Sequence, residues 1–153
     1  MPKTLGHRFK ICCFVDADHA GESLTSRSRT GFIVMSNNAP IYWHSKKHTY
    51  IETSTFGSEM MPMKQSADYI RGFRYKLRMF GIPVEDLSYM YGDNQSVLAG
   101  STRTESTLKK KAQSIAFHFI REGCAADELR TTYINTSENI SYLMTKPLSG
   151  EKR

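Results

Sequence analysis

The chain of 153 residues has no apolar run of the length that a membrane span requires. A spanning helix needs roughly 18 or more consecutive apolar residues, which excludes an integral membrane protein. The start, from Met1 to Lys10, lacks the apolar centre of a secretory signal. Three cysteines, Cys12, Cys13 and Cys124, are an odd number without CxxC spacing, so they predict neither a disulfide framework nor a zinc site. Together these absences favour a reducing, intracellular compartment.

The composition is that of a folded, basic chain. Apolar residues make up 39% and aromatic residues 11%, which argues against wholesale disorder and suffices for one hydrophobic core. There are 21 Lys and Arg against 15 Asp and Glu, a net charge of +6. Such a surplus suits a polyanionic partner without proving one, because many basic proteins bind no nucleic acid.

The hydrophobic pattern predicts a mixed sheet with helices packed on it, an α/β (α+β) domain with the order βββαβααβα. Strands are expected at residues 10–16, 30–36, 40–45, 87–92 and 129–134, and helices at 58–80, 94–100, 112–125 and 137–144. The domain is expected to cover residues 10–148, preceded by an extension of residues 1–9 and followed by a tail of residues 149–153. Strands two and three are so close in sequence that a hairpin is expected between them.

Three features of these elements have more than one interpretation. Pro62 costs roughly 3 kcal/mol inside a helix, so the long helix is expected either to begin near Pro62 or to kink there. The stripe of Arg71, Arg74 and Arg78 could hold phosphates or form a solvated face. Trp43 could stack on bases, but an aromatic residue in a strand is more often part of the core.

Three acids stand where a ligand site is expected. Asp16 and Asp93 follow two apolar strands, and ligands of open α/β sheets bind outside strand ends; Glu59 lies near the start of the long helix. Clustered carboxylates repel one another and normally need a hard cation such as Mg²⁺ or Mn²⁺. Two such ions about 4 Å apart are a standard device for cleaving phosphodiesters. The residues alone leave solvated strand-end carboxylates as the alternative, because a chain with 15 acids contains many such triples.

The segments around these acids resemble a known family, the ribonuclease H domain of copia-type LTR retrotransposon polyproteins. The resemblance covers about residues 10–148 and rests on seven words in the family's order: VDADHAG (Val15–Gly21), SRSRTGFIV (Ser26–Val34), PIYWHSKK (Pro40–Lys47), TSTFGSE (Thr53–Glu59), YGDNQSV (Tyr91–Val97), HFIRE (His118–Glu122) and LMTKPL (Leu143–Leu148). It implies a five-stranded mixed sheet flanked by helices. It also implies hydrolysis of the RNA strand of RNA–DNA hybrids by four metal-binding acids and two Mg²⁺ ions.

Three of the four acids carry over from the resemblance: Asp16 matches the first-strand Asp, Glu59 the helix Glu, and Asp93 the Asp of the GDNQS word. Strand alternation alone does not separate Asp16 from Asp18, and Asp16 is preferred because it directly follows the apolar run. Tyr142 stands where the family has the fourth acid. A neutral phenol with a pKa of about 10 is a poor ligand for Mg²⁺, so hydrolysis is expected to be impaired.

The expected nucleic-acid contacts are Asn94, Lys109, Lys110 and Lys111. Asn94 could equally cap a following helix, and the lysine run could equally be a solvated face that needs no ligand. A rival hypothesis is a repurposed, noncatalytic subunit that binds RNA or protein in a larger intracellular assembly. Tyr142 favours the rival, and so does a methionine start for a domain otherwise embedded in polyproteins, although a chain cut from a polyprotein would begin in the same way. If the site is degenerate, the metal ion could be absent.

Overall fold

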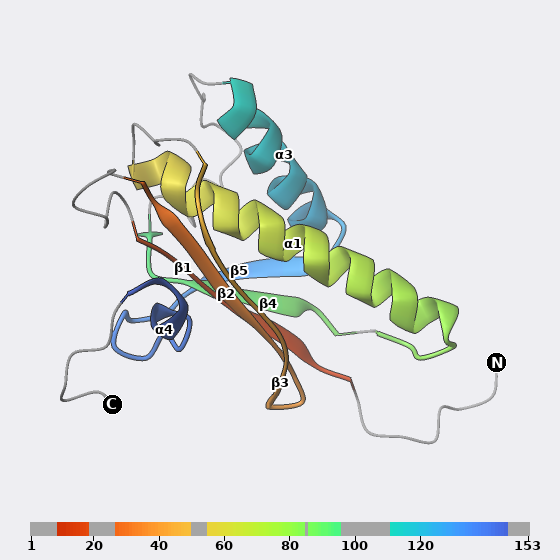
Figure 1. Ribbon diagram of the computed structural model, residues 1–153. Helices are drawn as coiled ribbons and strands as arrows, with labels where there is room; N and C mark the ends of the chain where they lie inside the picture. The colour runs from red at the N-terminus through yellow and green to blue at the C-terminus, as the bar shows by residue number, and fades with distance from the viewer. Residues whose placement is uncertain (1–8, 19–26, 50–54, 85, 96–110, 147–153) are drawn as a thin grey trace.

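A mixed five-stranded sheet forms the centre of the computed structural model, which describes residues 9–18, 27–49, 55–84, 86–95 and 111–146. In sequence order the strands are β1 (Ile11–Asp18), β2 (Arg29–Ser36), β3 (Ala39–Lys47), β4 (Ser88–Gly92) and β5 (Leu129–Tyr133) (Figure 1). Across the sheet the order is β3-β2-β1-β4-β5. The first three strands pair antiparallel, while β1, β4 and β5 pair parallel. The predicted mixed sheet is therefore confirmed, and each predicted strand lies within a few residues of an observed one.

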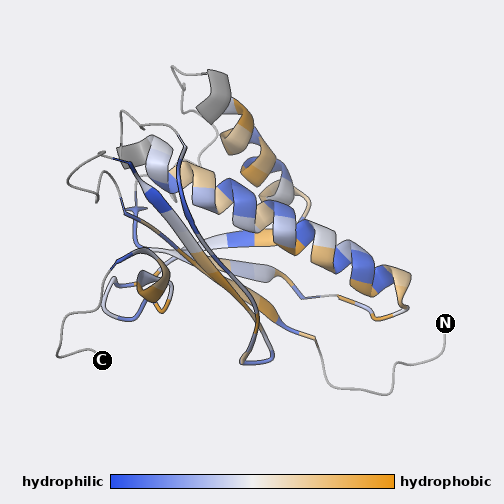
Figure 2. Cartoon of the chain, viewed as in Figure 1, coloured by the Kyte–Doolittle hydropathy of each residue, from blue (hydrophilic) through white to orange (hydrophobic). Residues whose placement is uncertain are grey.

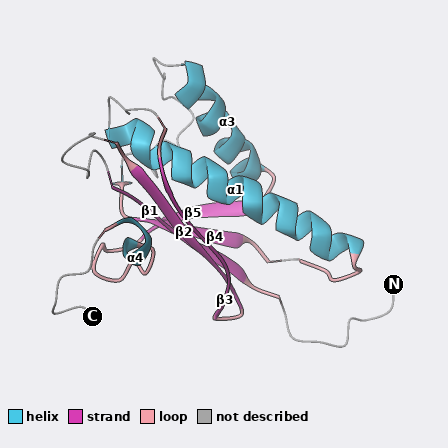
Figure 3. Ribbon diagram, in the orientation of Figure 1, coloured by secondary structure: helices cyan, strands magenta, loops and turns pink. Residues whose placement is uncertain are grey.

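The helices lie on opposite faces of this sheet. Helix α1 (Thr55–Met79) packs against β1, β2 and helix α3 (Lys111–Ala125) on one face (Figure 3). The short helix α4 (Tyr142–Thr145) lies against β1 and β2 on the other face. None of the described helices is long and apolar enough to cross a bilayer.

The hydrophobic core fills the space between the sheet and the pair α1 and α3. Alternate residues of β1 point into it, because successive side chains of a strand face opposite sides. Figure 2 shows the apolar colouring along these central strands. The core includes Ile11, Cys13 and Val15 of β1, Phe32 and Val34 of β2, Met60, Met63 and Ile70 of α1, and Phe117 and Ile120 of α3.

The β2–β3 connection is the hairpin that the sequence predicts. Asn37 and Asn38 have φ angles of 46° and 69°, and two successive positive φ values are characteristic of the tight turn that suits a twisted hairpin. Asn tolerates this left-handed backbone better than most residues. The turn fixes the register of β3 against β2.

Two predicted helices differ from the observed ones. Helix α1 begins at Thr55 and continues through Pro62, so the expectation that it begins at Pro62 is wrong. The expected helix at 137–144 is replaced by turns, and only Tyr142–Thr145 is helical. Of the expected helix at 94–100, residues 96–100 lie outside the described part of the chain.

Trp43 is 64% exposed on β3, so its predicted core position is also wrong.

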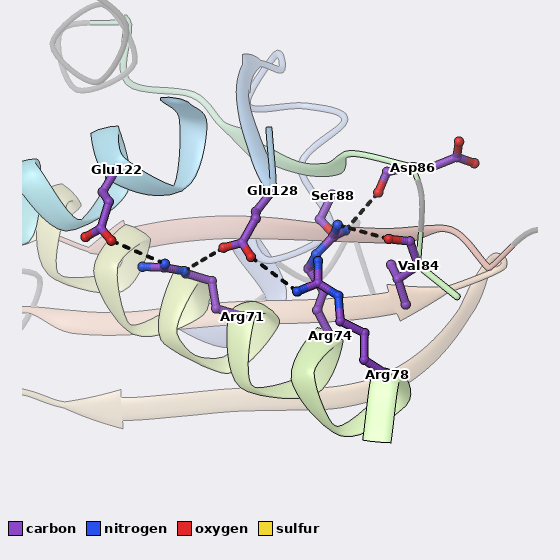
Figure 4. Close-up of polar contacts among 8 residues, drawn as sticks. All are labelled: Arg71, Arg74, Arg78, Val84, Asp86, Ser88, Glu122 and Glu128. Carbon is purple, nitrogen blue, oxygen red and sulfur yellow. Dashed lines mark hydrogen bonds and ion pairs between the residues drawn. The ribbon is translucent and has the colours of Figure 1, made fainter. Parts of the chain in front are cut away.

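The arginines of α1 pair with groups of the chain itself, and they differ in exposure: the Arg78 side chain is 51% exposed and that of Arg71 25% (Figure 4). Arg71 Nε lies 2.9 Å from Glu128 Oε2, and Arg78 Nη1 lies 3.7 Å from Glu128 Oε1. Arg74 is 3% exposed. It donates hydrogen bonds to the segment that leads into β4, namely to the carbonyl oxygens of Val84 and Asp86 and the hydroxyl of Ser88. Both earlier interpretations of the arginine stripe are therefore wrong for Arg74.

Candidate metal centre at the ends of the central strands

Asp16 and Asp93 lie at the same edge of the sheet because β1 and β4 are parallel neighbours. In their register Phe14 pairs with Tyr91, an offset of 77 residues (91 − 14). The same offset places Asp16 level with Asp93 (16 + 77), one residue past the end of β4. Adjacent strands are about 4.8 Å apart, so the sheet brings these two carboxylates into the same neighbourhood.

Asp16 is buried and held by residues at the end of α4. Its side chain is 1% exposed, and the Thr145 hydroxyl donates a hydrogen bond to its Oδ2. The ammonium of Lys146 lies 3.9 Å from the same oxygen. Burial raises the pKa of Asp16, and the charge of Asp93 raises it further, while the Thr145 hydrogen bond and Lys146 oppose the rise.

Contacts on both sides of Asp16 fix α4 against the sheet. The buried amide of Asn139 donates to the carbonyl oxygen of Val15 at 2.9 Å. On β2, Gly31 pairs with Asp16, and a Cβ at Gly31 would lie 2.6 Å from Thr145 Cγ2. Glycine therefore permits the close approach that brings the Thr145 hydroxyl to Asp16.

Glu59 reaches the same neighbourhood from α1 on the opposite face. It is half-buried, and burial followed by the negative charges of Asp93 and Asp16 raises its pKa from 4.5 to about 8. Lys146 opposes this rise. Glu59 therefore holds its proton at neutral pH when no cation is bound.

Asp93 is held by a residue of the loop after β5. It follows β4 directly and is half-buried, and the Thr136 hydroxyl donates a hydrogen bond to its Oδ2 at 2.9 Å. Thr136 comes from the loop after β5, whose Ile134 continues the pairing with Gly92 through a backbone hydrogen bond of 3.0 Å. The β4–β5 pair therefore orients this carboxylate.

The donor type and the charge of these acids fit a divalent cation. The charge of Asp93 contributes to the raised pKa of Asp16, and the charges of Asp93 and Asp16 contribute to that of Glu59; a hard cation would relieve this repulsion. As the side chains are placed, no three His, Cys, Asp or Glu residues within the described ranges surround a common point. Coordination of one ion by Asp16, Glu59 and Asp93 together would therefore require their carboxylates to rotate toward one another.

The other residues expected at the site are only partly described. Asn94 is half-buried beside Asp93. Lys109 and Lys110 lie outside the described residues, and Lys111 opens α3. Tyr142 is half-buried at the start of α4, where its ring centroid lies 4.6 Å from the ammonium of Lys146.

Comparisons with known proteins show what the chain is similar to. No protein-family model matches it. Over 144 residues it is 26% identical to the retrovirus-related Pol polyproteins from transposons RE2 and RE1 of Arabidopsis thaliana, a match that covers 94% of this chain and 10% of each polyprotein. It is 25% identical over 139 residues to the Pol polyprotein from transposon TNT 1-94 of Nicotiana tabacum. The chain thus spans only 10% of the length of these relatives.

Solved structures with a similar fold are ribonucleases H1. LC11-RNase H1, isolated from compost, superimposes with a TM-score of 0.66 at 13% identity, covering 89% of this chain and 92% of that one. RNase H1 from Halobacterium salinarum superimposes with a TM-score of 0.62 at 13% identity, covering 89% and 94%. The chain is a ribonuclease H-like homologue of copia-type Pol polyproteins. The family and the fold expected from the sequence words are confirmed, whereas the roles of the acids in this ribonuclease H-like chain stay predictions.

Sequence reasoning missed two groups of residues in this ribonuclease H-like chain. Thr145 and Lys146 belong to the LMTKPL word, which was used only to support the resemblance.

A cavity of about 150 Å³ next to β2, β3 and α1 was also missed. It is lined by Thr30, Lys46, Lys47, His48, Thr49, Met61 and Gln65. The run of basic residues directly after the predicted third strand was the available signal.

Proposed function

We propose that this ribonuclease H-like chain hydrolyses the RNA strand of RNA–DNA hybrids, with Asp16, Glu59 and Asp93 holding Mg²⁺ or Mn²⁺. The observation that carries the proposal is the parallel register of β1 and β4, which places Asp16 level with Asp93, together with the action of both charges on Glu59 of α1. A structural neighbour described as LC11-RNase H1 in complex with RNA/DNA hybrid, with a TM-score of 0.62, supports the class of substrate.

The metal ion would polarise the phosphodiester and lower the pKa of a coordinated water. The chain's own residues would set the geometry. Thr145 fixes the orientation of the Asp16 carboxylate through its hydroxyl. Thr136 does the same for Asp93. Glu59 would give up its proton when it binds the cation, because coordination requires the carboxylate form.

The loss of an acid at Tyr142 supports a slow enzyme or none. A noncatalytic role in binding RNA or protein within a larger assembly is therefore the second candidate. The relatives are polyproteins of which the chain spans 10%, so a partner domain is consistent with either candidate.

The proposed backbone contacts are Asn94, Lys109, Lys110 and Lys111, as the resemblance and the charge suggest. Among the described residues, Lys46 offers a further contact. It lines the cavity beside β3, and its strand partner Thr30 directly precedes Gly31, which pairs with Asp16. A phosphate at this cavity would lie about two strands, or roughly 10 Å, from the acids.

Cleavage of a labelled RNA–DNA hybrid in Mg²⁺ tests the proposal. We expect cleavage by the wild type, none by Asp93→Asn, and wild-type cleavage by Asp68→Asn, which removes a surface carboxylate of α1 paired with Lys64. Tyr142→Asp is expected to raise the rate by supplying the fourth acid. Hybrid or RNA binding without any cleavage, even with excess protein and Mn²⁺, would reject the enzyme and favour the noncatalytic candidate.

A further inference from the structure

A row of large apolar side chains crosses the sheet on the face that is turned away from the core. Trp43 of β3 pairs with Ile33 of β2, and Ile33 pairs in turn with Phe14 of β1. Phe14 pairs with Tyr91 of β4. Directly paired residues share a face, and Val15, the neighbour of Phe14, points into the core. Because successive side chains alternate, the row lies on the opposite face, which is the face of α4.

The aromatic rings of this face contact one another and reach the surface. The ring centroids of Phe14 and Tyr91 lie 5.1 Å apart, and those of Tyr91 and Tyr89 lie 6.3 Å apart. Trp43 is 64% exposed and Tyr89 is 38% exposed, whereas Phe14 and Tyr91 are half-buried. We call these four residues the ring platform.

Helix α4 covers only one end of this face. It has four residues, and it touches the sheet at Ser45, whose hydroxyl donates to the carbonyl oxygen of Met144 at 2.6 Å, and at Gly31. Ser45 and Gly31 are partners that lie two residues beyond Trp43 and its partner Ile33. Helices α1 and α3 lie on the other face, so no described helix covers the ring platform (Figure 1).

The charge beside the ring platform is positive. Arg130 of β5 pairs with Tyr89 and is exposed. The acids of the same face, Asp16 and Asp18, lie at the far end of β1. Glu128, directly before β5, binds arginines of α1 on the opposite face. Among the described strand residues, those around the rings therefore carry a positive charge and no negative one, which suits an anionic partner.

Aromatic rings on an open sheet beside a cation are the combination that holds single-stranded nucleic acid, because bases stack on the rings while phosphates pair with the cation. We propose that the ring platform binds a single-stranded stretch of nucleic acid by base stacking, with Arg130 holding a phosphate. Phe14 and Tyr91 precede Asp16 and Asp93 by two residues, about 7 Å along a strand, so the bound strand would pass beside the acids. The inference goes beyond the proposed hydrolysis and needs no metal ion.

The fluorescence of Trp43 tests this inference, because Trp43 is the only tryptophan of the chain. We expect an oligouridylate of about 12 nucleotides to quench it as a base stacks on the indole. Trp43→Ala should bind a labelled oligouridylate about tenfold more weakly, and Trp43→Phe, which keeps a ring, should stay within about threefold of the wild type. Tyr75→Ala is the matched control, because Tyr75 is 62% exposed on α1 and should not matter.

The salt dependence tests the role of the cation. Arg130→Met should reduce the slope of log affinity against log salt concentration by about 0.7, whereas Lys76→Met should leave it unchanged. If Trp43→Ala does not fold, Tyr89→Ala and the quenching of the wild type decide.

Three results would overturn the inference while leaving the proposed hydrolysis intact. The first is that Trp43 stays unquenched by the oligonucleotide. The second is equal affinity of the wild type and the folded Trp43→Ala variant. The third is a change in Trp43 emission with protein concentration alone, together with no binding of the oligonucleotide, which would assign this face to a protein contact.

Discussion

Replacing Glu59 by Gln should flatten the dependence of stability on pH in the metal-free chain. The pKa of Glu59 rises from 4.5 to about 8 in the folded state, mainly through burial and then through Asp93 and Asp16. Between these values the folded chain keeps a proton that the unfolded chain releases. Stability from this group is therefore fully present below about pH 4.5 and is lost as the pH rises toward 8.

The size of the effect follows from the same two values. A difference from 4.5 to about 8, at 1.36 kcal/mol per pH unit, sets an upper limit of about 5 kcal/mol for the loss of stability. Glu59 is half-buried, and water that reaches its carboxylate should reduce the loss to about 2–3 kcal/mol. Gln cannot ionise, so Glu59→Gln should be more stable than the wild type at pH 8 by about that amount.

Urea unfolding at several pH values between 5 and 8.5, with the metal removed by a chelator, measures this directly. Glu138→Gln is the control, because Glu138 lies exposed on the loop before α4. Added Mg²⁺ should stabilise the wild type at pH 8 more than it stabilises Glu59→Gln. Stability curves of the wild type and Glu59→Gln that run parallel across this pH range would refute the reasoning.

Three further predictions concern the surroundings of the acids and the framework that positions them. Gly31→Ala places a Cβ 2.6 Å from the Thr145 side chain of α4 and should lower the free energy of unfolding in urea by about 1–3 kcal/mol. Gly72→Ala, whose Cβ would meet nothing within 4 Å, should not destabilise the chain. Equal effects of the two substitutions would contradict the close approach of α4 to β2. Arg74→Met removes the donor from the buried Val84 carbonyl and the half-buried Asp86 carbonyl and should cost about 3 kcal/mol, against little change in Lys76→Met. Lys46→Met should reduce the slope of log affinity for an RNA–DNA hybrid against log salt concentration by about one. Lys76→Met is again the control. An unchanged slope would mean that the cavity does not contact a phosphate of the hybrid.

The strands were predictable because their signals are local. An apolar run of four or five residues bounded by polar ones marks β1, and two Asn residues mark the turn between β2 and β3. The pairing of β1 with β4 was a condition for the acids to converge and not a prediction from the sequence. The register that sets Asp16 level with Asp93 requires the structure.

Local competition explains the helix that was wrongly expected at 137–144. Asn135 Oδ1 accepts the backbone N–H of Ser137 at 3.0 Å, and Asn139 Oδ1 accepts that of Ser141 at 3.2 Å. Asn side chains that bond the backbone two residues ahead favour turns over helix. A close reading of the two Asn positions would have found this signal.

The remaining errors depend on contacts far apart in sequence. Trp43 lies on the exposed face of the edge strand β3, whereas its neighbours Tyr42 and His44 on the opposite face are half-buried. Nothing within its own segment fixes which face is covered. Arg74 is buried because the segment before β4 offers it three acceptors. Thr145 reaches Asp16 across 129 residues of sequence, so the sequence indicated the acids of the candidate site but not the residues of α4 that hold one of them.

A crystal of the wild type grown with Mn²⁺ tests the central claim most directly, through anomalous scattering at the manganese edge. The account predicts manganese bound by carboxylate oxygens of Asp16, Glu59 and Asp93. A map without manganese at this position, or with the three carboxylates too far apart to share an ion, would contradict it.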